Sequence, residues 1–134
     1  MDDNNKYAKW FRVAMWLGIV ANLLLGLPGI LFPNTVLRLL HQRPSTDILW
    51  TAFASTLVVV LALMYSPAAR DLFANRSTAR NAVISRAVGA IFFLILWPGY
   101  YVAFGLVDAI FFLILAPLLY KALKVYDMHS SGGP

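Results

Sequence analysis

The sequence predicts an all-α membrane protein, a four-helix transmembrane bundle with short loops. The chain is 60% hydrophobic and has a mean hydropathy of +0.71, whereas ordinary soluble domains are roughly 45–50% apolar. It also contains four long runs with almost no charge, each close to the roughly 20 residues that a helix needs to cross the hydrocarbon core. We therefore interpret all 134 residues as one integral membrane domain.

The first apolar run, residues 13–32, predicts a helix over about 10–32 that stays in the protein. It is longer than the apolar region of a signal peptide, and no cleavage motif of small residues follows it. The Gly-Leu-Pro-Gly sequence at 26–29, ahead of Pro33, predicts a kinked or frayed end. Residues 34–42 mix apolar and polar side chains and predict a short helix on the outer surface.

The second helix is predicted over about 47–66 and the third over about 78–97. Any of residues 45–47, Ser-Thr-Asp, can cap the second helix. We expect that helix to stop at Ser66, because Pro67 follows. Ser77 is the expected cap of the third helix.

The remaining apolar run is about forty residues long and must fold back on itself. Pro98-Gly99 is the favoured turn, because Pro lacks an amide hydrogen and Gly accepts left-handed angles. Gly105 is the alternative. A turn at Pro98-Gly99 predicts a fourth helix over about 100–123 and a flexible tail over 124–134.

Basic residues are concentrated on one side of the predicted membrane. Eight lie on the side of the two termini and only two lie in the loop between the first and second helices, which by the positive-inside rule places both termini in the cytoplasm. We interpret the net charge of +5 as an insertion signal and an attraction to the lipid bilayer, and not as nucleic-acid binding. The eight are Lys6, Lys9, Arg12, Arg70, Arg76, Arg80, Lys121 and Lys124, and the two are Arg38 and Arg43.

Arg86 and Asp108 are the only charged residues inside the four apolar runs, where an ionised group is costly. If the turn lies at Pro98-Gly99, their α carbons differ in depth by only about 4–5 Å, which an Arg side chain can span. If the turn lies at Gly105, the two residues cannot pair. Three roles stay open for Arg86: snorkelling to the cytoplasmic headgroups, pairing with Asp108, or binding a ligand.

Three uncharged polar residues lie at a similar depth. Asn22 stands between Gly18 and Gly26 on one helical face, where it can bridge helices or contact a ligand. Ser55 and Thr56 occupy the corresponding depth of the second helix, although their hydroxyls can simply bond the carbonyl one turn back. The candidate ligand-binding or structural polar core is Asp108, Arg86, Asn22, Thr56 and Ser55.

No group of residues in the sequence fixes a reaction. Cys is absent, which excludes disulfides, thiol redox chemistry and Cys-bound metals. His41 and His129 are expected in separate aqueous regions, so a pair of haem ligands within the bundle is not available. With no Glu, nucleophile motif or phosphate loop either, we expect no catalytic residue, metal or cofactor, and favour a non-enzymatic protein.

The layout resembles small bacterial membrane proteins of the DoxX-like type. The resemblance rests on Gly26–Pro33 closing the first helix, a short apolar and basic segment, and three further helices with Arg86 early in the third. It implies a four-helix protein of the bacterial inner membrane, and an analogy of this kind transfers no function or catalytic residue.

The leading hypothesis is a small polytopic protein that serves as an accessory subunit or membrane anchor and binds a partner protein, a lipid or a quinone between its helices. A bundle this small has little interior, so we expect a homo-oligomer or a partner membrane subunit. The alternative is an oligomeric transporter or channel with a polar midplane site built on Asp108, Arg86 and Asn22.

Overall fold

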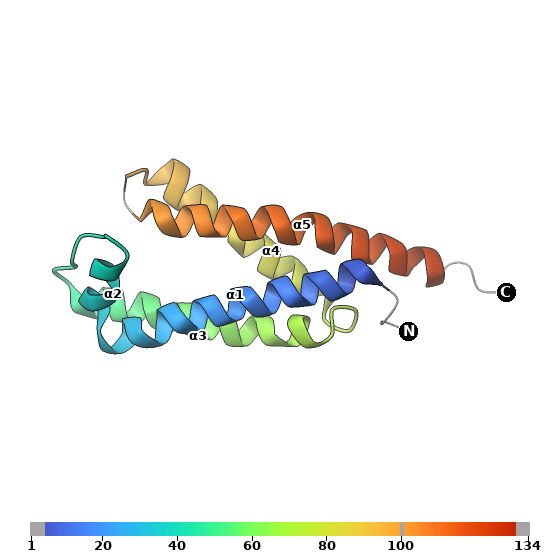
Figure 1. The fold of residues 1–134 in the computed structure, drawn as a ribbon, viewed down its shortest axis with the longest axis horizontal. Coiled ribbons are helices and arrows are strands. Elements are labelled where there is room, and N and C mark those ends of the chain that lie inside the picture. The colour runs from blue at the N-terminus through green and yellow to red at the C-terminus, as the bar shows by residue number, and fades with distance from the viewer. Residues whose placement is uncertain (1–4, 100, 131–134) are drawn as a thin grey trace.

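The computed structural model describes residues 5–99 and 101–130, which are all-helical apart from short connections (Figure 1). Four helical spans are long and apolar enough to cross a membrane, so the predicted four-helix, all-α class is confirmed. A short π-helix, which the sequence did not predict, continues the third of them. The elements are α1 (Lys6–Leu31), α2 (Pro33–Leu39), α3 (Ile48–Arg70), α4 (Arg76–Ile91), η1 (Phe92–Leu96) and α5 (Val102–Ser130).

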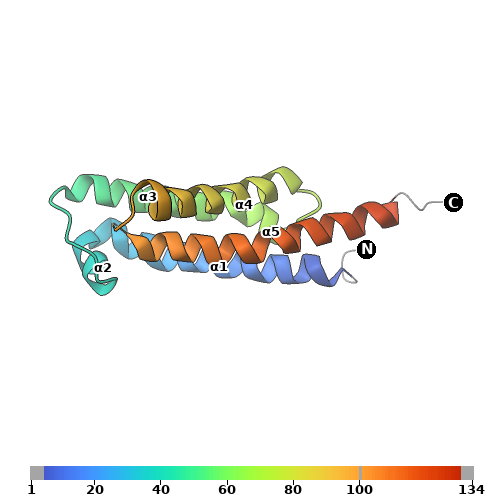
Figure 2. The ribbon, with the colours of Figure 1, turned by 90° about the horizontal axis from the view of Figure 1, so that it is seen from above.

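The long helices form two antiparallel hairpins, α1 with α3 and α4 with α5 (Figures 1 and 2). Glycines permit close packing within each hairpin. A Cβ atom added at Gly26 would lie 2.7 Å from Val59 Cγ2 on α3, and one added at Gly105 would lie 2.8 Å from Leu94 Cγ. Around the bundle, α3 neighbours α4 and α5 neighbours α1, so α1 and α4 lie diagonally opposite.

The apolar core fills only the half of the bundle near the chain termini. There the two hairpins converge, whereas they diverge toward the end that carries α2 (Figure 1). Many core residues are alanines, whose small side chains let the helices approach one another. The core residues are Ala8, Phe11, Ala14, Met15, Ile19, Ala62, Tyr65, Ala68, Ala69, Leu72, Ala79, Ala82, Val83, Leu115, Leu119 and Ala122.

The expected short surface helix is present as α2, with Pro33 in its first turn. The loop after it is fixed by Asn34, whose Oδ1 accepts from the Ser45 amide at 2.8 Å and whose Nδ2 donates to the Ser45 carbonyl at 3.3 Å. Asp47 then caps α3 by accepting from the amides of Leu49 and Trp50, one of the caps that the sequence allowed.

The ends of α3 and α4 differ from the prediction. α3 does not stop at Ser66 but continues to Arg70, because Ala68 and Ala69 are buried in the core and Pro67 removes only one helical hydrogen bond. α4 begins at Arg76, so Ser77 is not its cap. The residue at the cap position is Asn75, which donates instead to carbonyls at the end of α3 and in the loop.

Residues 124–130, which were predicted to be part of a flexible tail, continue α5 instead. The Tyr126 ring stacks on Phe73 at 4.3 Å between centroids, and the Arg76 guanidinium lies 4.4 Å from the same ring. Arg76 Nη1 also pairs with Asp127 Oδ1 at 3.3 Å. These contacts hold the last turns of α5 against the α3–α4 loop and the start of α4. Residues 131–134 lie outside the described part of the chain.

The first helix also begins earlier than predicted, at Lys6 in place of residue 10. Asn5 caps it through its Oδ1, which accepts from the Ala8 amide at 3.2 Å. The Asn5 side chain also donates to the Ala122 carbonyl of α5 at 3.0 Å, which joins α1 and α5 near the termini.

The turn before α5 lies at Pro98-Gly99, as predicted. Gly99 has a φ of +92°, in the region that favours glycine, and Tyr101 has a φ of +56°. Gly105, the alternative turn, is buried within α5 against η1. This register fixes which residues of α4 and α5 face one another.

Candidate functional site

Arg86 and Asp108 face one another across the α4–α5 hairpin. Arg86 Nη1 donates to Asp108 Oδ1 at 2.6 Å, and Arg86 is only 9% exposed. Of the three roles left open for Arg86, the structure contains the pair. The Arg86 side chain is buried inside the bundle.

Arg86 also reaches across the diagonal of the bundle to α1. Its Nη2 donates to Asn22 Oδ1 at 3.3 Å, although α1 and α4 are not neighbours among the described elements. One guanidinium therefore connects three helices, which uses the planar fork of donors that Arg offers and Lys does not.

Small and aromatic residues make room for this cluster. A Cβ atom at Gly18 would lie 3.2 Å from Arg86 Nη2, and one at Gly89 would collide with Asp108 Oδ2. The Phe111 ring lies beneath the guanidinium, 5.0 Å from its carbon to the ring centroid, a cation–π arrangement. The site thus depends on two glycines as much as on its charges.

A second polar pair, which the sequence analysis did not identify, links α3 to α4 beside Arg86. Ser85 Oγ donates to the Ala82 carbonyl at 2.8 Å, so the Tyr65 hydroxyl donates to Ser85 Oγ. The sequence offers only a weak indication of this pair. Ser85 is the only hydroxyl residue in the run 82–98, and it precedes Arg86. Its partner depends on packing between hairpins, which a single sequence does not reveal.

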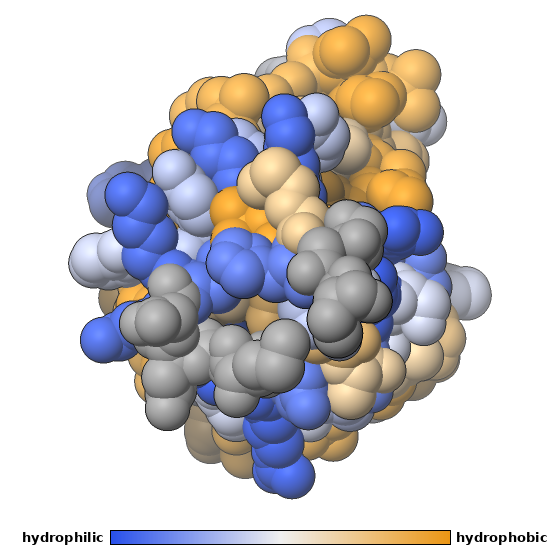
Figure 3. Space-filling view, turned by 90° about the vertical axis from the view of Figure 1, so that its right-hand side faces the viewer, coloured by the Kyte–Doolittle hydropathy of each residue, from blue (hydrophilic) through white to orange (hydrophobic). Residues whose placement is uncertain are grey.

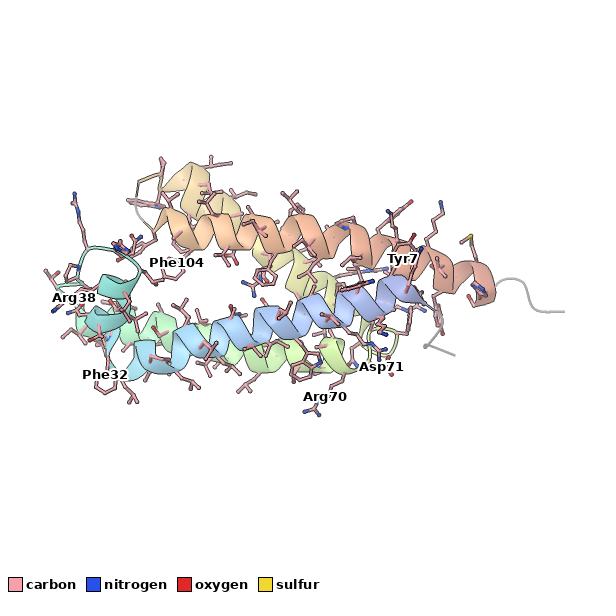
Figure 4. The ribbon with its side chains drawn as sticks, viewed as in Figure 1. Tyr7, Phe32, Arg38, Arg70, Asp71 and Phe104 are labelled. Carbon is pink, nitrogen blue, oxygen red and sulfur yellow. The ribbon has the colours of Figure 1, made fainter. Side chains whose placement is uncertain are left out.

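These polar residues close the inner end of a cavity of about 680 Å³ between the diverging hairpins. The walls are mainly apolar and come from every helical element, and Figure 4 shows Phe104 on the side of α5 that faces α2. We call the whole space the interhelical cavity. Its polar end is Asn22, Tyr65, Ser85, Arg86 and Asp108, and its opposite end is formed by Pro33, Val36 and Leu37 of α2 with Leu40 and Ser45 of the loop after it.

The two remaining predicted site residues, Ser55 and Thr56, lie on different sides of α3. Ser55 lines the cavity, where its Oγ donates to the Thr51 carbonyl at 3.0 Å. Thr56 is exposed, donates to the Ala52 carbonyl at 2.9 Å and does not line the cavity, so the structure does not bring it together with the other polar residues. Successive helical residues point about 100° apart, so the two hydroxyls cannot share one narrow face.

The polar end can hold a ligand by hydrogen bonds, and the apolar walls can hold a hydrocarbon chain. Within residues 5–99 and 101–130, no group of three His, Cys, Asp or Glu is placed to hold a metal ion. Fold and site together define an all-α bundle with four apolar helices of membrane-crossing length and a cavity between its hairpins. Comparison with protein-family models, curated proteins and solved structures finds no match for the chain.

Proposed function

We propose that this protein is a multi-pass membrane protein that binds a membrane-dissolved amphiphile, a lipid or a quinone, in the interhelical cavity. The observation that carries the proposal is the combination of mainly apolar walls with a hydrogen-bonding end in one cavity. Ligand sites are commonly apolar concavities of roughly 300–1,000 Å³ with a few convergent polar groups.

The surface supports a place in the membrane. Large apolar side chains are exposed along all four long helices, among them Leu24, Leu63, Ile95 and Leu113, each more than 60% exposed. Hydrophilic residues gather at the end that carries the termini (Figure 3). With the basic residues on that side, the proposed orientation has both termini in the cytoplasm. The DoxX-like layout supports the bacterial inner membrane.

The proposed role is that of an accessory subunit or anchor, and not of an enzyme. The core fills only the half of the bundle near the termini, so a large part of each helix is free to meet lipid, a second copy or a partner subunit. The polar end offers hydrogen bonds and one neutralised ion pair, which suit binding.

Trp50 provides a direct test, because it lines the α2 end of the cavity and is 65% exposed. Trp10→Phe, Trp16→Phe and Trp97→Phe together leave it as the only tryptophan of the original four. In nanodiscs, we expect its fluorescence to be quenched saturably by decylubiquinone or by a stearoyl amphiphile brominated in its chain.

The matched control keeps only Trp10, which is exposed near the termini and lies outside the cavity. It should show quenching that rises linearly with probe concentration, because only partitioning into the lipid brings the probe near it. Equal, unsaturable quenching of Trp50 and Trp10 by every probe would refute the proposed binding function.

The second candidate is an oligomeric transporter or channel, favoured by the position of Asp108, Arg86 and Asn22 at the inner end of an open cavity. Beyond that end, however, the core is closed by buried Leu115 and Leu119. Proteoliposomes that pass ions or small solutes, and that lose this flux in Asp108→Asn, would favour the transporter.

A further inference from the structure

We propose that the polar end of the interhelical cavity selects an uncharged head group that both donates and accepts a hydrogen bond, a hydroxyl or a primary amide on a hydrocarbon chain. This inference rests on the proposed binding function and names the class of head group. It follows from which atoms of the polar end are already engaged and which are free.

The charge of the polar end is already neutralised. Arg86 is the cation of the polar end, and its partner Asp108 lies 2.6 Å away. An anionic head group would therefore add an uncompensated negative charge beside a carboxylate and between apolar walls, where an unpaired charge is costly. Phosphate and carboxylate head groups are disfavoured for this reason.

Two atoms of the polar end remain available, one acceptor and one donor. A guanidinium can only donate, so the amide oxygen of Asn22 must face Arg86 and Nδ2 is left over. Among the described residues, neither Asn22 Nδ2 nor Asp108 Oδ2 makes a hydrogen bond, and neither is sealed away, because no fully buried side-chain polar atom lacks a partner.

The two free atoms belong to residues that flank one guanidinium. Asn22 and Asp108 bind the two terminal nitrogens of the same guanidinium, and both line the cavity. A hydroxyl can donate to Asp108 Oδ2 and accept from Asn22 Nδ2 at once. A ketone or ester can only accept, so it would leave the carboxylate oxygen unpaired, at the desolvation cost of an unmade hydrogen bond.

The test compares head groups on one chain. Brominated stearoyl amphiphiles ending in a hydroxyl, a primary amide, a methyl ester or a phosphate are titrated against the Trp50-only protein in nanodiscs. We expect saturable quenching by the hydroxyl and amide compounds, with an affinity about fivefold or more above that of the ester and the phosphate.

Asn22→Asp tests the head-group contact, because a carboxylate keeps an acceptor for Arg86 but removes the Nδ2 donor. The second carboxylate shares one guanidinium with Asp108, so we expect a lower thermal stability, and about fivefold weaker binding of the hydroxyl compound by the folded protein. Thr56→Ala is the control, since that hydroxyl is engaged with the Ala52 carbonyl outside the cavity, and it should bind as the parent does.

The outcomes separate the two proposals. Saturable quenching in which the ester, the phosphate or decylubiquinone binds as tightly as the hydroxyl compound would overturn the head-group assignment and leave the binding function standing. So would unchanged binding in Asn22→Asp. Absence of saturable quenching by any compound would overturn both.

Discussion

At the scale of single residues, Arg86 holds the polar end of the cavity together. Its guanidinium is held by Asp108, by Asn22 and by the Phe111 ring, which belong to two other helices. Removing one partner of a buried pair leaves an uncompensated charge, which typically costs more than the pair itself contributes. The polar end should therefore respond to substitution as one unit.

Arg86→Leu and Asp108→Asn should each lower the free energy of unfolding in mixed micelles, by about 3 kcal/mol. The double variant should cost clearly less than the sum of the two, because neither charge is then left without its partner. Denaturant titration of all four proteins measures the coupling. Costs that simply add would show that the pair has no structural role.

Gly89 makes the pair possible, because any side chain there meets Asp108 Oδ2. Gly89→Ala should destabilise the protein by about 1–3 kcal/mol. Val88→Ile also adds one carbon, but on an exposed position, and should change the stability by less than about 0.5 kcal/mol. Equal stabilities of the two variants would contradict this packing.

The position of a site residue could be predicted only where it follows from the local sequence. The Pro98-Gly99 turn set the register of α4 and α5, so the facing of Arg86 and Asp108 could be expected before the structure. Tyr65 and Ser85 meet through the packing of one hairpin on the other, and hairpin packing leaves no signal in either segment. Ser55 and Thr56 could not be separated without knowing which face of α3 meets the cavity.

At the scale of elements, the helices exist where hydropathy places them, but tertiary contacts move their ends. Burial of Ala68 and Ala69 carries α3 past Pro67. Contacts of Tyr126 with Phe73 in the α3–α4 loop and of Asp127 with Arg76 at the start of α4 carry α5 to Ser130. Local helix propensity does not predict either of these helix ends, because the stabilising partners lie far away in the sequence.

Tyr126→Ala should loosen the end of α5, because the ring is stacked on Phe73 and lies under Arg76. We expect faster amide hydrogen exchange over residues 126–130, with the exchange of the core unchanged. Tyr120→Ala, at an exposed position of the same helix, is the control and should leave that exchange as it is. The same protection in both variants would mean that the stack does not hold this end.

At the scale of the whole molecule, two hairpins converge on a core of small residues and diverge around the cavity (Figures 1 and 2). The proposed orientation places the α2 end outside and the termini inside. Since the chain has no Cys, single introduced cysteines can report this orientation without labelling of any native thiol.

Thr46→Cys and Ser77→Cys place a thiol on exposed positions at the opposite ends of the bundle. In intact spheroplasts, a membrane-impermeant maleimide should label Thr46→Cys only, and Ser77→Cys should react after permeabilisation. Labelling with the opposite preference would reverse the proposed orientation.

The proposed function requires that the interhelical cavity holds an amphiphile. Native mass spectrometry of protein extracted from membranes tests it most directly, with Ala54→Trp, which fills the cavity, beside Leu57→Trp, an exposed position outside it. We expect a bound amphiphile in the parent and Leu57→Trp proteins and its loss from Ala54→Trp, with all three equally folded. The same bound species in all three, or in none, would contradict the proposed function.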